Sequence, residues 1–244
     1  MRTIVVFSGA GLSADSGIPT FRGTDGLWEN HKVEDVAEHE AWFRNKELVL
    51  RFYEQRYNAY KSCKPHDGHF AIAKLQDHFN VINVTQNIDN LLEQAGCKNV
   101  THIHGTVGRK KCEWHNDITV LNGDPKFICD YKADMNAAIQ LGDQCPKCGG
   151  QMRPDIVFFN ECVHHTYENI VEQVKEVKYN DGIFICVGTS VQVYPAGYYI
   201  PLFSQVKNKY IVDIKPQKVA DYVLLTGTAS EQLPILVDKL ISEL

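Results

Sequence analysis

A short apolar strand that runs directly into a glycine-rich turn sets the fold class near the N-terminus. Residues 3–7 read TIVVF, a β-branched run typical of a buried parallel strand. The segment GAGLSADSGIPTFRG follows, and Gly9 and Gly11 leave room for backbone amides to approach a pyrophosphate near the start of a helix. The spacing is neither G-x-G-x-x-G nor a GK[ST] motif. The sequence predicts an anion-binding turn in an α/β fold, and a plain glycine turn is the alternative interpretation.

Further runs of strand length recur between amphipathic helical patterns. They cover residues 80–85, 100–103, 156–159, 182–188 and 210–214. Strands that alternate with helices favour a parallel sheet covered on both faces.

Two segments differ in composition and in hydrophobic pattern from the rest of the chain. Residues 33–79 are helical in pattern, and residues 107–154 are rich in Cys, Gly and Asp. We expect them to form a smaller helical and metal-binding module, inserted into a sheet domain made of residues 1–32, 80–106 and 155–244.

Charge and composition exclude some classes of function. The net charge of the 244 residues is -5 and no long basic run occurs, so nucleic-acid binding is not expected. The N-terminal apolar stretch is too short for a signal peptide or a membrane span, which predicts a cytoplasmic protein with no membrane contact. In that reducing compartment the eight cysteines are expected to be free thiols or metal ligands.

The cysteine spacing predicts a structural zinc ion. Cys145 and Cys148 lie three residues apart in CPKCGG, which is typical of half a tetrahedral site. Cys112 is the upstream candidate, and the fourth ligand is either Cys129 or His115; thiolate softness favours Cys129. The remaining cysteines are expected to be unligated thiols: Cys63, Cys97, Cys162 and Cys186.

Four separate motifs, taken together, resemble the sirtuin family. They are GAGLSADSGIPTFRG, TQNID at 85–89, HIHG at 102–105 and GTS at 188–190, and they span most of the chain in the family's order. The resemblance implies a Rossmann-type NAD domain with a smaller helical and zinc-binding module. It also implies an NAD-dependent protein-lysine deacylase, which acts on acylated-lysine proteins and releases nicotinamide and O-acyl-ADP-ribose.

The resemblance implies that His104 accepts a proton from a ribose hydroxyl of NAD and that Asn87 is the second catalytic residue. His102 would point to the same side of an ideal strand, so periodicity cannot separate the two histidines. Asp89 is implied to bind the nicotinamide carboxamide; Asn87 and Asp89 would also serve as helix caps. Phe21 is implied to shield the reacting ribose from water. The full set of positions expected to bind NAD is Gly9, Ala10, Gly11, Ser13, Asp15, Thr20, Phe21, Arg22, Trp28, Gln86, Asn87, Ile88, Asp89, Gly188, Thr189, Ser190, Asp213, Ile214, Lys215 and Ala229.

Tyr53 and Arg56 are the candidate specificity pair. In the helical pattern KELVLRFYEQRYNAY they lie at i and i+3 and share a face, so a phenol and a guanidinium can converge on one carboxylate. A Tyr-x-x-Arg pair resembles the bacterial class III sirtuins that remove succinyl, malonyl and glutaryl groups. The alternative is a surface arginine beside a packed tyrosine.

The acyl-lysine tunnel is expected to be lined by Val157, Phe158, Phe159 and Val193. The family usually has FGE where this chain has Phe159, Asn160 and Glu161, so the approach of the peptide could differ. Two other functions use the same residues: ADP-ribosyl transfer or NAD hydrolysis, and a non-catalytic NAD-binding sensor.

Overall fold

The computed structural model describes residues 1–20, 27–28, 31–114, 129–161, 177, 181–189 and 206–244. The chain divides into two compact units. Unit 1 comprises Met1–Thr20, Cys63–Ile103 and His165–Leu244, and unit 2 comprises Phe21–Ser62 and His104–His164.

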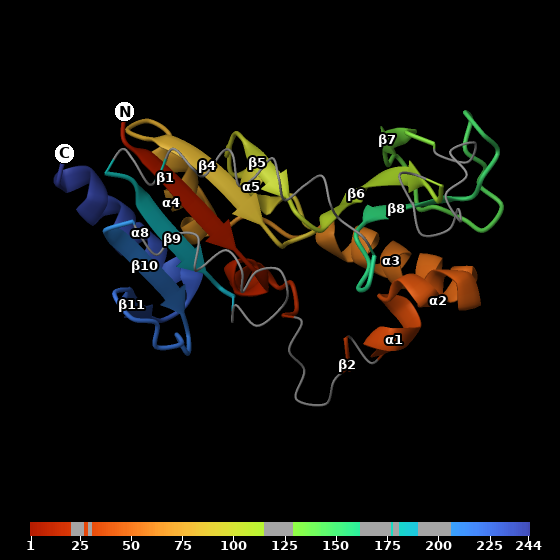
Figure 1. The fold of residues 1–244 in the computed structure, drawn as a ribbon, viewed down its shortest axis with the longest axis horizontal. Helices are drawn as coiled ribbons and strands as arrows, with labels where there is room; N and C mark the ends of the chain where they lie inside the picture. The colour runs from red at the N-terminus through yellow and green to blue at the C-terminus, as the bar shows by residue number, and fades with distance from the viewer. Residues whose placement is uncertain (21–26, 29–30, 115–128, 162–176, 178–180, 190–205) are drawn as a thin grey trace. The chain divides into compact units, whose positions relative to one another are not determined.

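Unit 1 is built on a six-stranded parallel sheet with the order β11-β10-β9-β1-β4-β5 (Figure 1). The strands are β1 (Thr3–Ser8), β4 (Asn80–Thr85), β5 (Val100–His102), β9 (Ile183–Val187), β10 (Asn208–Asp213) and β11 (Val223–Thr226). Every neighbouring pair is parallel. The chain leaves β1 toward β4 on one side and later returns to β9 on the other, which places a topological switch point beside β1.

Both faces of this sheet are buried. Ile4 and Val6 of β1 belong to one apolar cluster, and Val5 and Phe7 belong to another. Two 3-10 turns, η1 (Ala10–Leu12) and η2 (Ala14–Ser16), follow β1, and the helices are α4 (Asp67–Leu75), α5 (Leu91–Gln94) and α8 (Ala229–Ser242). The near-continuous apolar strands therefore form a doubly covered parallel sheet, as their sequence predicts.

Unit 2 combines helices with small antiparallel sheets. Its helices are α1 (Val33–Val36), α2 (His39–Arg44) and α3 (Lys46–Tyr60), and β2 (Leu27–Trp28) pairs with β3 (His31–Lys32). A three-stranded sheet has the order β7-β6-β8, from β7 (Lys132–Asp134), β6 (Gly105–Cys112) and β8 (Met152–Ile156). Asn45 caps α3, because its side chain accepts a hydrogen bond from the Leu48 amide at 3.0 Å.

One expected strand differs from the observed one. Residues 156–159 are not a parallel strand of unit 1; β8 ends at Ile156 and runs antiparallel to β6 in unit 2. Beyond Ile156 the Phe158 amide donates to the Glu161 carboxylate at 2.8 Å instead of to a neighbouring strand. The half-exposed strand β11 has a weak apolar pattern and was not expected from the sequence. Among the described helices, none has the length and apolar character to cross a membrane.

Candidate active site and zinc centre

The glycine turn after β1 packs directly on the end of β9. The Gly9 amide donates to the Val187 carbonyl at 3.0 Å, and the Gly11 amide donates to the Gly188 carbonyl at 2.8 Å. A Cβ atom added at Gly11 would lie 2.6 Å from the Gly188 Cα, and one added at Gly9 would lie 2.7 Å from the Thr189 Cβ. These two amides are thus used within the protein, and the glycines are required here because two loops pack backbone against backbone.

A polar cluster lies where β1, β4 and β9 end, at the carboxyl edge of the sheet. The Ser13 hydroxyl donates to Asp89 Oδ2 at 2.9 Å and accepts from Asn87 Nδ2 at 3.0 Å. Gln86 Nε2 donates to the Thr189 hydroxyl at 2.9 Å. Five residues expected from the sequence to contact NAD are therefore brought together from three segments of the chain. Hydroxyl, amide and carboxyl groups of this kind suit a ribose and a carboxamide.

Asp89 also contacts the backbone at the start of α5. Its Oδ1 accepts from the Leu91 amide at 3.1 Å, although the N-cap position itself is Asn90. Asp89 is buried, and burial raises the pKa of its carboxyl group despite the hydrogen bonds from Leu91 and Ser13. Its carboxyl group therefore bonds the helix start and belongs to the polar cluster at the same time.

The other expected NAD positions are spread over unit 1. The Asp15 carboxylate accepts from the Ser230 hydroxyl at 2.5 Å, next to the buried Ala229. Asp213, at the end of β10, accepts from the Lys215 amide at 2.8 Å.

The remaining expected NAD positions differ in exposure. Ala10 lies in η1, and Ile88 is partly buried between Asn87 and Asp89 of the polar cluster. Thr20 and Ile214 are exposed. Trp28 belongs to unit 2, and Phe21, Arg22, Ser190 and Val193 lie outside the described residues.

His102 has a partner at each ring nitrogen. Nδ1 lies 2.7 Å from the Asn87 carbonyl oxygen, and Nε2 lies 2.8 Å from Glu93 Oε1. Burial by itself lowers the pKa of His102, but Glu93 and the Asn87 carbonyl outweigh it and raise the pKa above its ordinary value. Both partners are acceptors, so these contacts favour the doubly protonated ring, in which both nitrogens donate. Such a ring is poorly suited to accept a further proton.

His104 follows at the start of unit 2 and is half-buried. Its carbonyl accepts from the Val157 amide at 2.9 Å, which ties it to the segment expected to bind the acyl-lysine. The next residue, Gly105, has φ +75°, and a Cβ there would overlap the Asp155 carbonyl. Only glycine fits after His104.

The pair on α3 is buried. Tyr53 is 2% exposed and Arg56 is 1% exposed, which excludes the interpretation of Arg56 as a surface residue. Arg56 Nη1 donates to the Phe52 carbonyl at 2.6 Å, and the guanidinium carbon lies 3.2 Å from the Phe52 ring centroid. The Tyr53 ring centroid lies 5.9 Å from that of Phe158. The candidate specificity pair and one expected tunnel residue therefore lie close together within unit 2.

The segment expected to bind the acyl-lysine is held by a buried ion pair. Arg153 Nη2 lies 2.7 Å from Glu161 Oε2 and donates to the Ile156 carbonyl at 2.7 Å. Lys111 Nζ lies 3.2 Å from Glu161 Oε1. Burial opposes the charge on Glu161, but Arg153 and Lys111 outweigh it and lower the pKa of the carboxyl group. This network was not predicted from the sequence, where the only signal was charged residues within an apolar stretch.

Asn160 adopts φ +64° next to this network. Asparagine enters the left-handed region more readily than most residues with a side chain, so it can occupy a position where the family usually has glycine.

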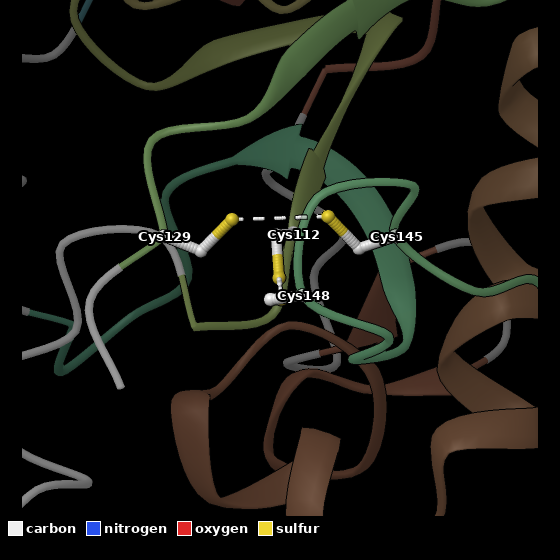
Figure 2. Close-up of side chains that lie close together, drawn as sticks. All are labelled: Cys112, Cys129, Cys145 and Cys148. Atoms are coloured by element: carbon white, nitrogen blue, oxygen red, sulfur yellow. Dashed lines mark hydrogen bonds between the residues drawn. The ribbon is translucent and has the colours of Figure 1, made fainter. Parts of the chain in front are cut away.

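Four thiols meet in unit 2. The Sγ atoms of Cys112, Cys129, Cys145 and Cys148 all lie within 4.8 Å of one another. Cys112 Sγ is 3.3 Å from Cys148 Sγ, and Cys129 Sγ is 3.7 Å from Cys145 Sγ; Figure 2 shows the latter two pointing toward each other. Tetrahedral zinc with Zn–S bonds of about 2.3 Å separates its sulfur ligands by about 3.8 Å.

Local backbone geometry favours the thiolate at Cys145, whereas burial raises the pKa of the Cys112 and Cys129 thiols in the absence of a metal. The Gly149 amide donates to the Cys145 carbonyl at 2.8 Å, which closes the tight turn between Cys145 and Cys148. Burial disfavours the Cys145 thiolate, but amides of Lys147 and Cys148 outweigh it and lower the pKa of the thiol. The four cysteines are placed to hold one structural zinc ion, which confirms Cys129 as a member of the set; His115 lies outside the described residues.

The other cysteines are not part of this cluster. Cys97 and Cys186 are buried thiols, Cys63 is partly buried, and Cys162 lies outside the described residues.

Comparison with known proteins defines the class to which this fold and site belong. Residues 9–195 match the model of the Sir2 family. The chain is 35% identical over 243 residues to an NAD-dependent protein deacylase of Pyrococcus abyssi, with 97% of this chain and 92% of that protein covered. It is 38% identical over 241 residues to an NAD-dependent protein deacylase of Bdellovibrio bacteriovorus, with coverage of 96% and 94%.

A solved structure agrees with these matches. A crystal structure of a Sir2 homologue in complex with NAD superposes with a TM-score of 0.82 at 30% identity, and the match covers 99% of this chain and 90% of that one. The chain therefore belongs to the Sir2, or sirtuin, family.

Proposed function

We propose that this chain is an NAD-dependent protein-lysine deacylase that prefers acidic acyl groups, such as succinyl and malonyl, and also removes acetyl groups. The products would be nicotinamide, O-acyl-ADP-ribose and a free lysine on the substrate protein. Family membership and the names of the relatives support the general activity. The observation that carries the acyl preference is the buried pair Tyr53 and Arg56 on α3.

The chemistry of this pair suits a carboxylate. Arginine stays protonated at physiological pH and can donate two parallel hydrogen bonds to one carboxylate. Burial raises the pKa of Tyr53 well above its ordinary value in spite of the opposing charge of Arg56, so the phenol stays protonated and can donate a third. An acetyl group offers no carboxylate, so it would enter the same pocket without these bonds.

Residues of unit 1 would hold the cofactor. When bound, NAD supplies the sugar carbon to which the acyl oxygen is transferred. The Asp89 carboxyl group would bind the carboxamide, Asn87 would orient the ribose, and Ser13 fixes both side chains through its hydroxyl. His104 would accept the proton of a ribose hydroxyl; His102 is less suited to this role, because both of its ring nitrogens face acceptors.

Other residues would position the substrate and shape the module. Val157, Phe158 and Phe159 would line the path of the acyl-lysine, together with Val193. The zinc ion would be structural, because four protein thiolates leave no coordination position for a reactive water.

The test is a panel of acetyl-, malonyl-, succinyl- and glutaryl-lysine peptides of one sequence, assayed with NAD for nicotinamide release and for the deacylated peptide. Arg56→Met should lower kcat/KM for the succinyl peptide at least about tenfold, because charge-assisted hydrogen bonds contribute about 1.5–3 kcal/mol. Deacetylation by the same variant should change much less, since it does not use the guanidinium.

Arg51→Met is the matched control. Arg51 lies on the same helix but is exposed and pairs with Glu47 at 3.0 Å, so both activities should stay at the level of the unmodified protein. Equal losses of desuccinylation and deacetylation in Arg56→Met would contradict the acidic acyl preference.

The panel also separates the other functions of this cofactor. Label from NAD that becomes attached to protein while the acyl groups remain would indicate ADP-ribosyl transfer, and peptide-independent release of nicotinamide would indicate NAD hydrolysis. NAD binding with no turnover of any peptide would indicate a sensor. His104→Ala should bind NAD and lose deacylation.

A further inference from the structure

His66 connects the start of α4 with the 3-10 turn η1, which follows the glycine turn after β1. It is the N-cap residue of α4, and its Nδ1 accepts from the Gly68 amide at 3.0 Å. Its Nε2 lies 2.7 Å from the carbonyl oxygen of Leu12 in η1. All three residues belong to unit 1, so one imidazole links two segments that lie more than fifty positions apart in sequence.

These two contacts determine the protonation state of the ring. A carbonyl oxygen can only accept, so Nε2 must carry a proton; an amide can only donate, so Nδ1 must be bare. Only the neutral imidazole with its proton on Nε2 makes both bonds. A second proton would set an N–H group against the Gly68 amide, and the ring would have to leave one of its two partners.

The Leu12 carbonyl is part of the peptide that orients Ser13. The nitrogen of that peptide, the Ser13 amide, donates to the Ala10 carbonyl at 3.1 Å. The Ser13 hydroxyl in turn holds Asn87 and Asp89. The hydrogen bond from His66 therefore fixes the orientation of the Leu12–Ser13 peptide, and through Ser13 it affects the positions of Asn87 and Asp89.

We propose that His66 is a positioning residue for cofactor binding, which in its neutral form fixes the Leu12–Ser13 peptide and thereby the Asn87–Asp89 cluster. The inference rests on the proposed use of this cluster for NAD. It predicts that NAD affinity falls when the ring is removed, and that part of the affinity is lost on acidification.

Among the described residues, Asp15 and His69 are titratable side chains that interact with the ring. The Ser230 hydroxyl and the nearby His66 lower the pKa of the Asp15 carboxyl group against the opposing effect of burial. His69 of α4 lies with its ring centroid 4.3 Å from that of His66, and burial lowers its pKa to about 3. His69 therefore stays neutral under mild acidification and does not contribute to a pH-dependent difference at this position.

The experiment compares His66→Asn with the unmodified protein. Asparagine is a good N-cap residue, so α4 keeps its cap, but its shorter side chain cannot also reach the Leu12 carbonyl. We measure NAD affinity by calorimetry at about pH 8 and about pH 5.5, and stability by urea unfolding. At the higher pH the variant should bind NAD about fivefold more weakly, and its free energy of unfolding should fall by no more than about 1 kcal/mol, the contribution of one hydrogen bond.

Acidification should weaken NAD binding more in the unmodified protein than in His66→Asn, because only the former has an imidazole at this position. Asn45→Ala is the control for the loss of a helix cap as such. It removes the cap of α3 in unit 2, so it should lower the unfolding midpoint and leave NAD affinity unchanged.

An affinity of His66→Asn equal to that of the unmodified protein at both values of pH would overturn the inference and leave the proposed function intact. Failure of the unmodified protein to bind NAD would overturn both.

Discussion

Glu161 is the buried anion that holds the segment of unit 2 expected from the sequence to bind the acyl-lysine. Its side chain is 9% exposed and faces two cations, Arg153 at 1% exposure and Lys111 at 7%. It also accepts the Phe158 amide at 2.8 Å. Glu161→Gln preserves the shape and one acceptor for that amide, but it leaves both cations without their carboxylate.

The expected cost is large. Removal of one partner of a buried ion pair costs about 3–5 kcal/mol, because the remaining charge stays desolvated. This range applies because the side chains of Glu161 and Arg153 are only 9% and 1% exposed. Total stabilities are only about 5–15 kcal/mol, so the variant should be close to its stability limit. With a urea slope of about 3 kcal/mol/M, the unfolding midpoint should fall by roughly 1 M or more.

The assay is urea unfolding followed by tryptophan fluorescence, together with KM for the acylated peptide. Glu47→Gln is the matched control: it removes the partner of Arg51 in an exposed pair, so it should cost less than about 1 kcal/mol. A cost for Glu161→Gln as small as that of Glu47→Gln would refute the reasoning.

The pH dependence provides a second check on Glu161. Its pKa in the folded protein lies below the ordinary value, since Arg153 and Lys111 outweigh the effect of burial. The carboxylate therefore stabilises the folded state above its ordinary pKa, and this contribution is lost as the pH falls through the folded-state pKa. Acidification should lower the stability of the unmodified protein more than that of Glu161→Gln.

Three further changes test other parts of the site. Gly11→Ala should weaken NAD binding about tenfold or more, since its Cβ would lie 2.6 Å from the Gly188 Cα; unchanged binding by calorimetry would show that the loops can separate freely. Cys145→Ser should lower the bound zinc, measured by atomic absorption, and destabilise unit 2, while full retention of one zinc ion per chain would contradict its role as a ligand. Asn160→Ala should cost about 1 kcal/mol in urea unfolding because of the φ of +64°, whereas Asn160→Gly should not; equal stabilities would count against backbone strain at this position.

Local patterns were sufficient for several elements. The apolar run before the glycine turn predicted β1, and the period of KELVLRFYEQRYNAY predicted a helix that the structure places at Lys46–Tyr60. The same period placed Tyr53 and Arg56 on one face. The spacing of Cys145 and Cys148 predicted half of a zinc site, because two ligands on one tight turn need no other part of the chain.

Contacts between segments that lie far apart in sequence could not be predicted from local patterns. Either Cys129 or His115 could be the fourth zinc ligand by sequence, and Cys129 is identified by the four thiols that come together only when the chain folds. His102 and His104 are equivalent by strand periodicity, and only the folded chain shows that the ring nitrogens of His102 face the Asn87 carbonyl and the Glu93 carboxylate.

The ion pair of Arg153 and Glu161 illustrates the same limit. Its members lie eight residues apart, but their burial, the approach of Lys111 and the turn at Asn160 all depend on how β8 ends. Secondary-structure period and ligand spacing are properties of neighbouring residues, so a linear pattern records them. The charge state of a buried side chain depends on which distant groups surround it, and that is determined when the chain packs.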